Sequence, residues 1–295
     1  MQNVLAQLEP PTGVVRVVLD TDAYNEIDDQ FAIAYAIRSP RLAVEAVYAA
    51  PFHNQRSTGP GDGMRRSYDE ITRLLDLLGV DPALAHQGAT EWMAEPATPV
   101  RSAATDDLIS RAMSATQDAP LYVVAIGAPT NVASAVIAAP EIADRIVVVW
   151  LGGNPSWWHR ASEFNLDQDP TASRVILDCL APLVRVPCVN VAEHLRTSFW
   201  ELREHLDQTS PLGRYLLTIF ENYYDDHRAR SKEIWDIGPV AWLVDPSWTV
   251  STIVHSPVVT DAGSWAQHPG RPLSREVWTF HRDPVFADLF DRLTG

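Results

Sequence analysis

The sequence predicts an α/β fold: a single domain spanning residues 1–295, built on a doubly wound, mostly parallel sheet flanked by helices. Three observations lead to this fold class. Short apolar runs alternate with segments of helical spacing along the whole chain, which is typical of doubly wound sheets. No internal repeat, low-complexity segment or linker divides the chain. Its 295 residues, 46% of them hydrophobic, are enough for one large core.

The strands are predicted from short apolar runs, rich in β-branched residues, that end in polar or glycine-containing clusters. Continuous apolar runs of this length are typical of parallel strands buried on both faces. The predicted strands are, in order, Val14–Leu19, Leu42–Ala50, a short piece within Pro82–Gly88, Leu121–Ile126, Arg145–Leu151, Leu183–Val189 and Glu276–Phe280.

The helices are predicted where apolar residues recur at helical spacing and a stop signal follows. Ser39-Pro40 ends the first helix, and Gly79 ends the second. The predicted helices are Phe31–Ile37, Tyr68–Leu78, Asp106–Ser114, Ala172–Leu180, Phe199–Tyr224 and Asp283–Leu293. Residues 51–67, rich in Gly, Pro and polar residues, are expected to form a loop at the sheet edge where ligands bind in open α/β folds.

The first strand is followed at once by a dense group of carboxylates. Five acidic side chains fall within ten residues, and like charges so close repel one another unless some protonate or a cation binds. A hard divalent ion with oxygen ligands, such as Ca²⁺ or Mg²⁺, suits this chemistry. The alternative is a solvated acidic turn in which Asp28 or Asp29 caps the next helix. The five residues are Asp20, Asp22, Glu26, Asp28 and Asp29.

Composition narrows the classes of partner. The formal net charge of −15 argues against a nucleic-acid backbone or an anionic membrane. The two cysteines, Cys179 and Cys188, form neither a disulfide framework nor a zinc spacing, and we expect both to be small buried residues. The first residues show no signal-peptide pattern, and no stretch approaches a membrane span. A cytoplasmic protein is expected.

Four segments, in the same order, resemble the inosine–uridine-preferring nucleoside hydrolases. They are DTD…DDQFA at 20–32, GAPTN at 127–131, SEFN at 162–165 and WDIGP at 235–239. Five residues separate the two acidic pairs where that family has three, so the chain resembles a divergent branch. The resemblance implies a calcium-dependent N-ribohydrolase of nucleoside salvage. It also implies a small nucleoside-like substrate and assembly as a homodimer or homotetramer.

The resemblance also assigns site residues. It implies Ca²⁺ ligands at Asp22, Asp29, Asp236 and the carbonyl oxygen of Thr130, with Asp22 as catalytic base and Asp20 as a structural residue. Sugar hydroxyls would meet Asp28, Glu163 and Asn165, with Phe164 packed inward; a carboxylate and an amide two residues apart on an extended chain point the same way. Further substrate-binding candidates are Asn54, Asn154, Trp157 and Trp235.

The chain departs from the family at the position expected to protonate the leaving base. Trp235 stands where most members carry His, and an indole stacks on a base but cannot act as a general acid. Three routes stay open: another acid, a base that leaves without strong acid help, or weak catalysis on an unusual substrate. The alternative acids are His53, His159, His227, Tyr223 and Tyr224.

Two other functions compete with hydrolysis. One is a non-catalytic protein of the same fold that holds a sugar or nucleoside, since fold does not fix function. The other is a phosphatase of the haloacid dehalogenase type, which also begins with a strand and Asp-x-Asp. That type needs a hydroxyl residue two positions after Asp22, where this chain has Tyr24, and a lysine; Lys232 is the only lysine here.

Overall fold

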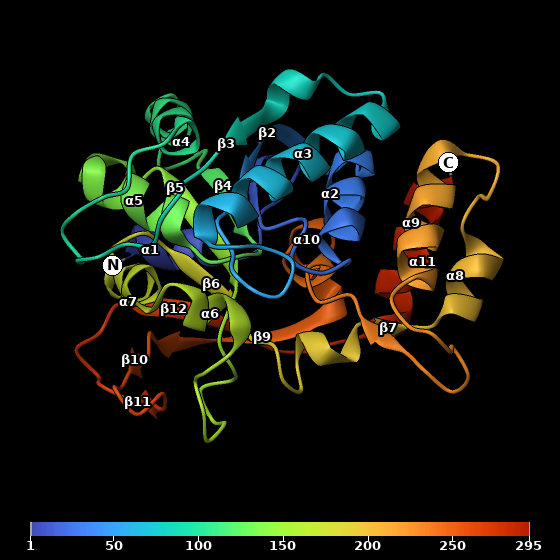
Figure 1. Cartoon of the computed structure of the whole chain (residues 1–295). Coiled ribbons are helices and arrows are strands. Elements are labelled where there is room, and N and C mark those ends of the chain that lie inside the picture. The colour runs from blue at the N-terminus through green and yellow to red at the C-terminus, as the bar shows by residue number, and fades with distance from the viewer. Residues whose placement is uncertain (1, 295) are drawn as a thin grey trace.

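The computed structural model describes residues 2–294 and is organised around one eight-stranded sheet. The strand order is β3-β2-β1-β4-β5-β6-β12-β9 (Figure 1). Every neighbouring pair is parallel except β12 and β9, which are antiparallel. In sheet order the strands span Ala85–Gln87, Leu42–Ala49, Val15–Thr21, Leu121–Ala125, Ile146–Leu151, Leu183–Val186, Leu273–Phe280 and Thr249–His255. The mostly parallel sheet is confirmed.

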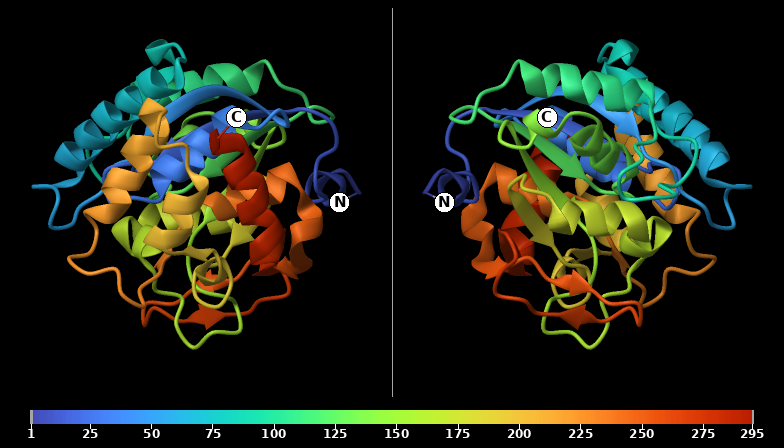
Figure 2. Two further views of the ribbon diagram at one scale, coloured as in Figure 1. Left: turned by 90° about the vertical axis from the view of Figure 1, so that its right-hand side faces the viewer. Right: turned by 90° about the vertical axis from the view of Figure 1, so that its left-hand side faces the viewer.

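Helices cover both faces of the sheet, so the strands are buried on both sides (Figures 1 and 2). In β1, Val17 and Leu19 face one apolar core and Val18 faces the other. The first core contains α2 (Asp29–Arg38), α3 (Pro60–Leu78), α8 (Phe199–His205), α9 (Pro211–Glu221), α10 (Ile237–Val244) and α11 (Arg282–Thr294). The second contains α4 (Ala103–Met113), α5 (Thr130–Ala138), α6 (Phe164–Gln168) and α7 (Pro170–Asp178).

The remaining elements are short. Helix α1 (Gln2–Gln7) precedes the sheet, and two small antiparallel pairs lie outside it, β7 with β8 and β10 with β11. Their bounds are Arg196–Thr197, Lys232–Glu233, Val258–Val259 and Trp265–Ala266, and 3₁₀ turns occupy Pro82–Leu84, Pro140–Ile142, Ala192–His194 and Pro246–Trp248.

Several predicted boundaries are wrong for local reasons. Helix α3 begins at Pro60, eight residues early, because proline suits the first helical turn; the loop therefore ends at Gly59. The predicted helix over 199–224 is two helices, and the second begins at Pro211 behind a Ser210 cap. Strand β6 ends at Val186, since Pro187 cannot donate to the ladder, and Cys188 lies in a loop. Strand β9 was not predicted.

The strand order reverses between β1 and β4, which are adjacent although β2 and β3 separate them in sequence. Chain segments leaving these two strands therefore run in opposite directions across the sheet. In open α/β folds this reversal opens a crevice at the carboxyl ends of the strands. The carboxylate-rich segment after β1 and the turn after β4 both begin there.

Candidate active site

A cavity of about 480 Å³ lies at the carboxyl end of β1, β4 and β5. Residues far apart in the sequence line it, from residue 22 to residue 236. Its acidic lining residues are Asp22, Glu26, Asp28, Glu163 and Asp236. Three of the four segments that carry the resemblance, at 20–32, 162–165 and 235–239, contribute to this lining.

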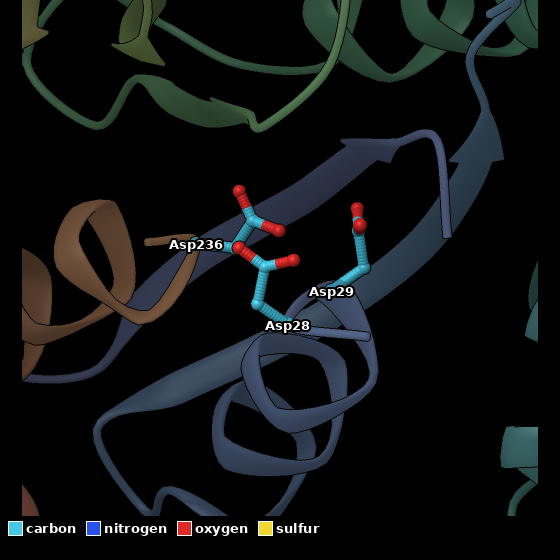
Figure 3. A group of neighbouring side chains, drawn as sticks. All are labelled: Asp28, Asp29 and Asp236. Atoms are coloured by element: carbon cyan, nitrogen blue, oxygen red, sulfur yellow. The ribbon is translucent and has the colours of Figure 1, made fainter. Parts of the chain in front are cut away.

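Three carboxylates form the tightest group. Asp28, Asp29 and Asp236 each offer an oxygen within 4.8 Å of the others. Figure 3 shows the first two at the start of α2 and the third at the start of α10, with their carboxylates directed to one region. Asp28 occupies the N-cap position of α2, but its side chain makes no capping hydrogen bond. The solvated-turn alternative is therefore not what the structure shows.

Asp22 joins this group from the end of β1. All four carboxylates are between 1% and 4% exposed, and burial is the main cause that raises each pKa. The pKa of Asp28 rises to about 6 and that of Asp29 to about 8, with the neighbouring carboxylates adding to the effect. The pKa values of Asp22 and Asp236 are raised by the same causes.

These residues fit a bound metal ion. The buried Oδ2 of Asp22 has no hydrogen-bond partner among the described residues. The charge of Lys232 lowers the pKa of Asp28, but this ammonium already pairs with Glu26 at 2.6 Å. A hard cation with oxygen ligands would supply the missing positive charge. Gly127 leaves room for this arrangement, because a Cβ there would lie 3.1 Å from the Asp22 carboxyl carbon.

The predicted main-chain ligand lies elsewhere in the structure. Thr130 is buried, does not line the cavity, and donates its hydroxyl to Asp169 at 2.8 Å. Ile126, at the end of β4, does line the cavity, and its carbonyl oxygen accepts from Asn165 Nδ2 at 3.3 Å. The geometry makes Ile126 the better candidate for a carbonyl ligand, and the sequence pattern alone gave no signal for it.

Asp20 is held away from the cavity. It is fully buried, and Asn131 Nδ2 donates to its Oδ1 at 2.8 Å. Burial raises its pKa to about 7, and the Asn131 hydrogen bond opposes that rise. Asn131 also accepts from the Ala89 N–H at 2.8 Å, so Asp20 belongs to a network that ties β1 to the turns around it.

The predicted sugar-binding residues lie on one wall of the cavity. The Glu163 carboxylate caps α6, accepting from the N–H groups of Asn165 at 2.9 Å and Leu166 at 3.3 Å, and it also accepts from Gly153 N–H at 2.8 Å. Burial raises the pKa of Glu163, which these N–H groups oppose. Asn154 also lines this wall, and its Nδ2 donates to Ser162 O.

Two details of this wall differ from the prediction. The chain after Glu163 is the first turn of α6 and not an extended segment, so Asn165 reaches the cavity from a helix. Phe164 is 37% exposed and lines the cavity, where it was expected to pack inward. A helix start places both a carboxylate and an amide at the cavity because the capping side chain folds back over the first turn.

Aromatic and further polar side chains also line the cavity. Trp235 and Tyr223 line the cavity, and the backbone N–H of Trp235 donates to Asp28 Oδ2 at 3.2 Å. Asn54 lines it as well, with its Nδ2 hydrogen-bonded to Asn25 Oδ1 at 2.6 Å. Trp157 is 56% exposed and does not line the cavity, so the structure does not bring it to the site.

Of the five alternative acids, the structure brings one to the cavity. Tyr223 lines it, whereas His53, His159, His227 and Tyr224 do not. His227 is instead stacked on Phe199, with Nε2 2.8 Å from the Glu221 carbonyl oxygen. Burial raises the pKa of Tyr223, which makes the phenol a weaker acid. Cys188 and Arg56 also line the cavity, and no pattern in the sequence marked either as a site residue.

Comparison with known proteins shows the family and the fold of the chain. The family model described as inosine-uridine preferring nucleoside hydrolase matches residues 17–277, most of the chain. The chain belongs to this family. This nucleoside hydrolase is therefore an N-glycosyl hydrolase, and the family assignment replaces the phosphatase alternative.

Two relatives of this nucleoside hydrolase are named for hydrolysis of nucleosides. The pyrimidine-specific ribonucleoside hydrolase RihA of Klebsiella pneumoniae (strain 342) is 26% identical over 240 residues, covering 74% of this chain and 76% of that protein. A probable uridine nucleosidase 2 of Arabidopsis thaliana is 25% identical, covering 72% and 70%.

Solved structures of nucleoside hydrolases share the fold. A plant nucleoside hydrolase, the PpNRh1 enzyme, superposes with a TM-score of 0.75 at 22% identity, covering 95% of this chain and 99% of that one. A purine-preferring ribonucleoside hydrolase from Gardnerella vaginalis gives 0.75 at 20% identity, with 94% and 98% covered. Within residues 2–294, no helix of this nucleoside hydrolase has both the length and the apolar character needed to cross a bilayer.

Proposed function

We propose that the chain is a calcium-dependent N-ribohydrolase that splits a nucleoside or nucleoside-like ribosyl compound into free sugar and free base. The observation that carries the proposal is the buried carboxylate group at the cavity floor, which lacks a matching positive charge from the protein. Asp22, Asp29 and Asp236 would hold the ion, with a main-chain oxygen at Ile126 or Thr130. A bound calcium ion would lower the pKa of a coordinated water and order the sugar diol.

The chain's own residues perform the remaining steps. Asp22 lines the cavity with one carboxylate oxygen unpartnered, and as base it would take a proton from the attacking water. Asp28, Glu163 and Asn165 would position the sugar hydroxyls, with Asn54 and Asn154 at the flanks. The negative charge around the sugar ring favours an oxocarbenium-like transition state, as carboxylates do in glycoside hydrolysis.

Trp235 would stack on the leaving base. Its side chain is half-buried and it lines the cavity. Its backbone N–H donates to the Asp28 carboxylate. If it faces the base, Trp235→His would add an acid at that wall and raise purine nucleoside hydrolysis relative to the native protein. Unchanged purine turnover in that variant would show that position 235 does not face the leaving group.

A sugar- or nucleoside-binding protein without catalysis is the second candidate, because no imidazole lines the cavity in the described structure. One assay separates the two: release of reducing sugar from inosine, uridine, adenosine and nicotinamide riboside, with calcium and after chelation. The proposal predicts release that chelation abolishes and calcium restores. Binding of these compounds without any sugar release would establish the binding protein.

We also propose a cytoplasmic homodimer or homotetramer. Both cysteines are free, which suits a reducing compartment. Val250 in the edge strand β9 and Trp278 in its neighbour β12 are both exposed, and assembly would cover such apolar side chains. Light scattering coupled to size-exclusion chromatography tests the assembly, and a monomer mass at micromolar concentration would refute it.

A further inference from the structure

Arg56 is the one cationic side chain that lines the cavity in the described structure. It comes from the loop over 51–59, between β2 and α3. Lys232, the other basic residue nearby, is 3% exposed and is paired with Glu26. It does not line the cavity. The cavity of this acidic protein therefore presents a single guanidinium among five carboxylates.

The guanidinium is held in place without being neutralised. Its Nη1 donates to the carbonyl oxygen of Glu26 at 3.0 Å, and the group lies over the Tyr24 ring, 5.9 Å from the centroid. The Arg56 N–H donates to Asn54 Oδ1 at 2.8 Å, which fixes the backbone as well. Among residues 2–294, no carboxylate oxygen lies within 4.0 Å of the guanidinium, and its Nε and Nη2 make no hydrogen bond.

Contacts connect Arg56 to the residues proposed to meet the leaving base. Its Nη1 donates to the carbonyl oxygen of Glu26, whose side chain pairs with Lys232, and the Lys232 ammonium lies 5.4 Å from the Tyr223 ring centroid. Tyr223 and Trp235 line the same cavity as Arg56 and are the residues proposed to meet the base.

Cleavage of the glycosidic bond places a negative charge on the departing base. The C1′–N bond breaks, and its electron pair goes to the ring nitrogen of the base. A guanidinium cannot donate its proton in a protein, but its fork of N–H groups binds an anion strongly. In a 2-oxopyrimidine the charge spreads onto the carbonyl oxygen beside the glycosidic nitrogen, which is an acceptor of the kind a guanidinium binds.

We infer that Arg56 stabilises the departing base as an anion, so that this enzyme favours leaving groups with a carbonyl oxygen next to the glycosidic nitrogen, such as uracil. The inference rests on the proposed function. Water adds its oxygen to C1′ and gives one proton to Asp22. The base anion leaves against Arg56 and takes a proton from solvent, while Asp22 returns its own, so one water is consumed for each sugar and base.

The test compares two ribosides whose leaving groups need different amounts of stabilisation. Uridine releases a poor leaving group, whereas 4-nitrophenyl β-D-ribofuranoside releases an anion that is already stabilised by its nitro group. We expect Arg56→Ala to lower kcat/KM on uridine by on the order of 100-fold and on the nitrophenyl riboside by no more than about threefold. Arg56→Lys should recover part of the loss, since it restores the charge but not the planar fork.

Arg66→Ala is the matched control. Arg66 also lies over the Tyr24 ring, at 5.8 Å, but it pairs with Asp62 at 3.0 Å and does not line the cavity. Both activities should persist in this variant. Equal losses on both substrates in Arg56→Ala, or no loss on uridine, would overturn the inference. A native protein that cleaves inosine but not uridine would overturn the inference and leave the N-ribohydrolase standing; one that cleaves no nucleoside would overturn both.

Discussion

Two groups of buried carboxylates in this molecule differ in where their positive charge comes from. Glu276, in β12, is fully buried and pairs with Arg185 of β6, which is 1% exposed. The Glu276 Oε1 also accepts from Ser156 N at 3.1 Å and Ser156 Oγ at 3.0 Å. Arg185 in turn donates to the Asn154 carbonyl at 2.6 Å and lies 4.7 Å from the Trp265 ring centroid. Every charge here has a partner from the chain.

The carboxylates at the ends of β1, α2 and α10 have no such partner. These four side chains are buried like Glu276 and Arg185: Asp22, Asp28, Asp29 and Asp236. Lys232, whose charge acts on Asp28, is already paired with Glu26. Although burial disfavours its charge, Asp28 and Glu26 raise the pKa of Lys232. A buried charge is costly unless it is paired. The first group therefore serves the fold, and we propose that the second binds a metal ion.

The sharpest test of this difference removes one charge from the unpaired group. Asp29→Asn keeps the shape of the side chain but leaves three carboxylates for the ion. We expect hydrolysis to fall by at least about 1,000-fold and calcium affinity to fall with it. In chelator the same variant should melt at a higher temperature than the native protein, because repulsion is relieved. Asp69→Ala, an exposed position on α3, is the control and should change neither property.

Removing the carboxylate of the paired group should have the opposite effect on stability. Glu276→Gln leaves the Arg185 guanidinium buried without a counter-ion, and such losses cost about 3–5 kcal/mol. Denaturant unfolding measures this free energy. The exposed pair of Arg101 with Asp106, whose side chains are 58% and 56% exposed, is the control; Asp106→Asn should cost no more than about 1 kcal/mol. A Glu276→Gln cost as small as the control would remove the distinction between the two groups.

The raised pKa values in the unpaired group also predict how stability depends on pH. Burial raises the pKa of Asp28 to about 6 and of Asp29 to about 8, above their values in the unfolded chain. Between pH 5 and 8 the folded, metal-free protein therefore holds more protons than the unfolded chain, and its free energy of unfolding should fall as pH rises. Saturating calcium should remove or reverse this slope. A metal-free protein whose stability is constant or rises across this window would contradict the account.

The sequence predicted much of the fold because its signals are local. Apolar runs such as Leu121–Ile126 are buried on both faces and identify parallel strands without further information. The early start of α3 at Pro60 was missed because the segment 60–67 is rich in glycine and polar residues, and the break before Pro211 was missed because only the short segment 206–210 interrupts the helical spacing. Strand β9 was missed because it is half-exposed, and its apolar pattern is weak.

The predicted site residues came mainly from motifs, and the structure places most of them at one cavity. The exceptions are instructive. Thr130, the first residue of α5, does not line the cavity, whereas Ile126 does; a main-chain ligand carries no mark in the sequence. Trp157 lies in an exposed turn, and an aromatic residue in a loop does not show which way the loop folds. Arg56 comes from a loop of no recognisable motif, and only its placement draws attention to it.

Titration calorimetry of calcium into chelator-stripped protein, at pH 6 and at pH 8, tests the central claim most directly. The ion must displace protons held by the raised-pKa carboxylates, so we expect one saturable site per chain with clearly tighter binding at pH 8 than at pH 6. An absence of saturable binding at both pH values, or an affinity that is the same at both, would contradict the account.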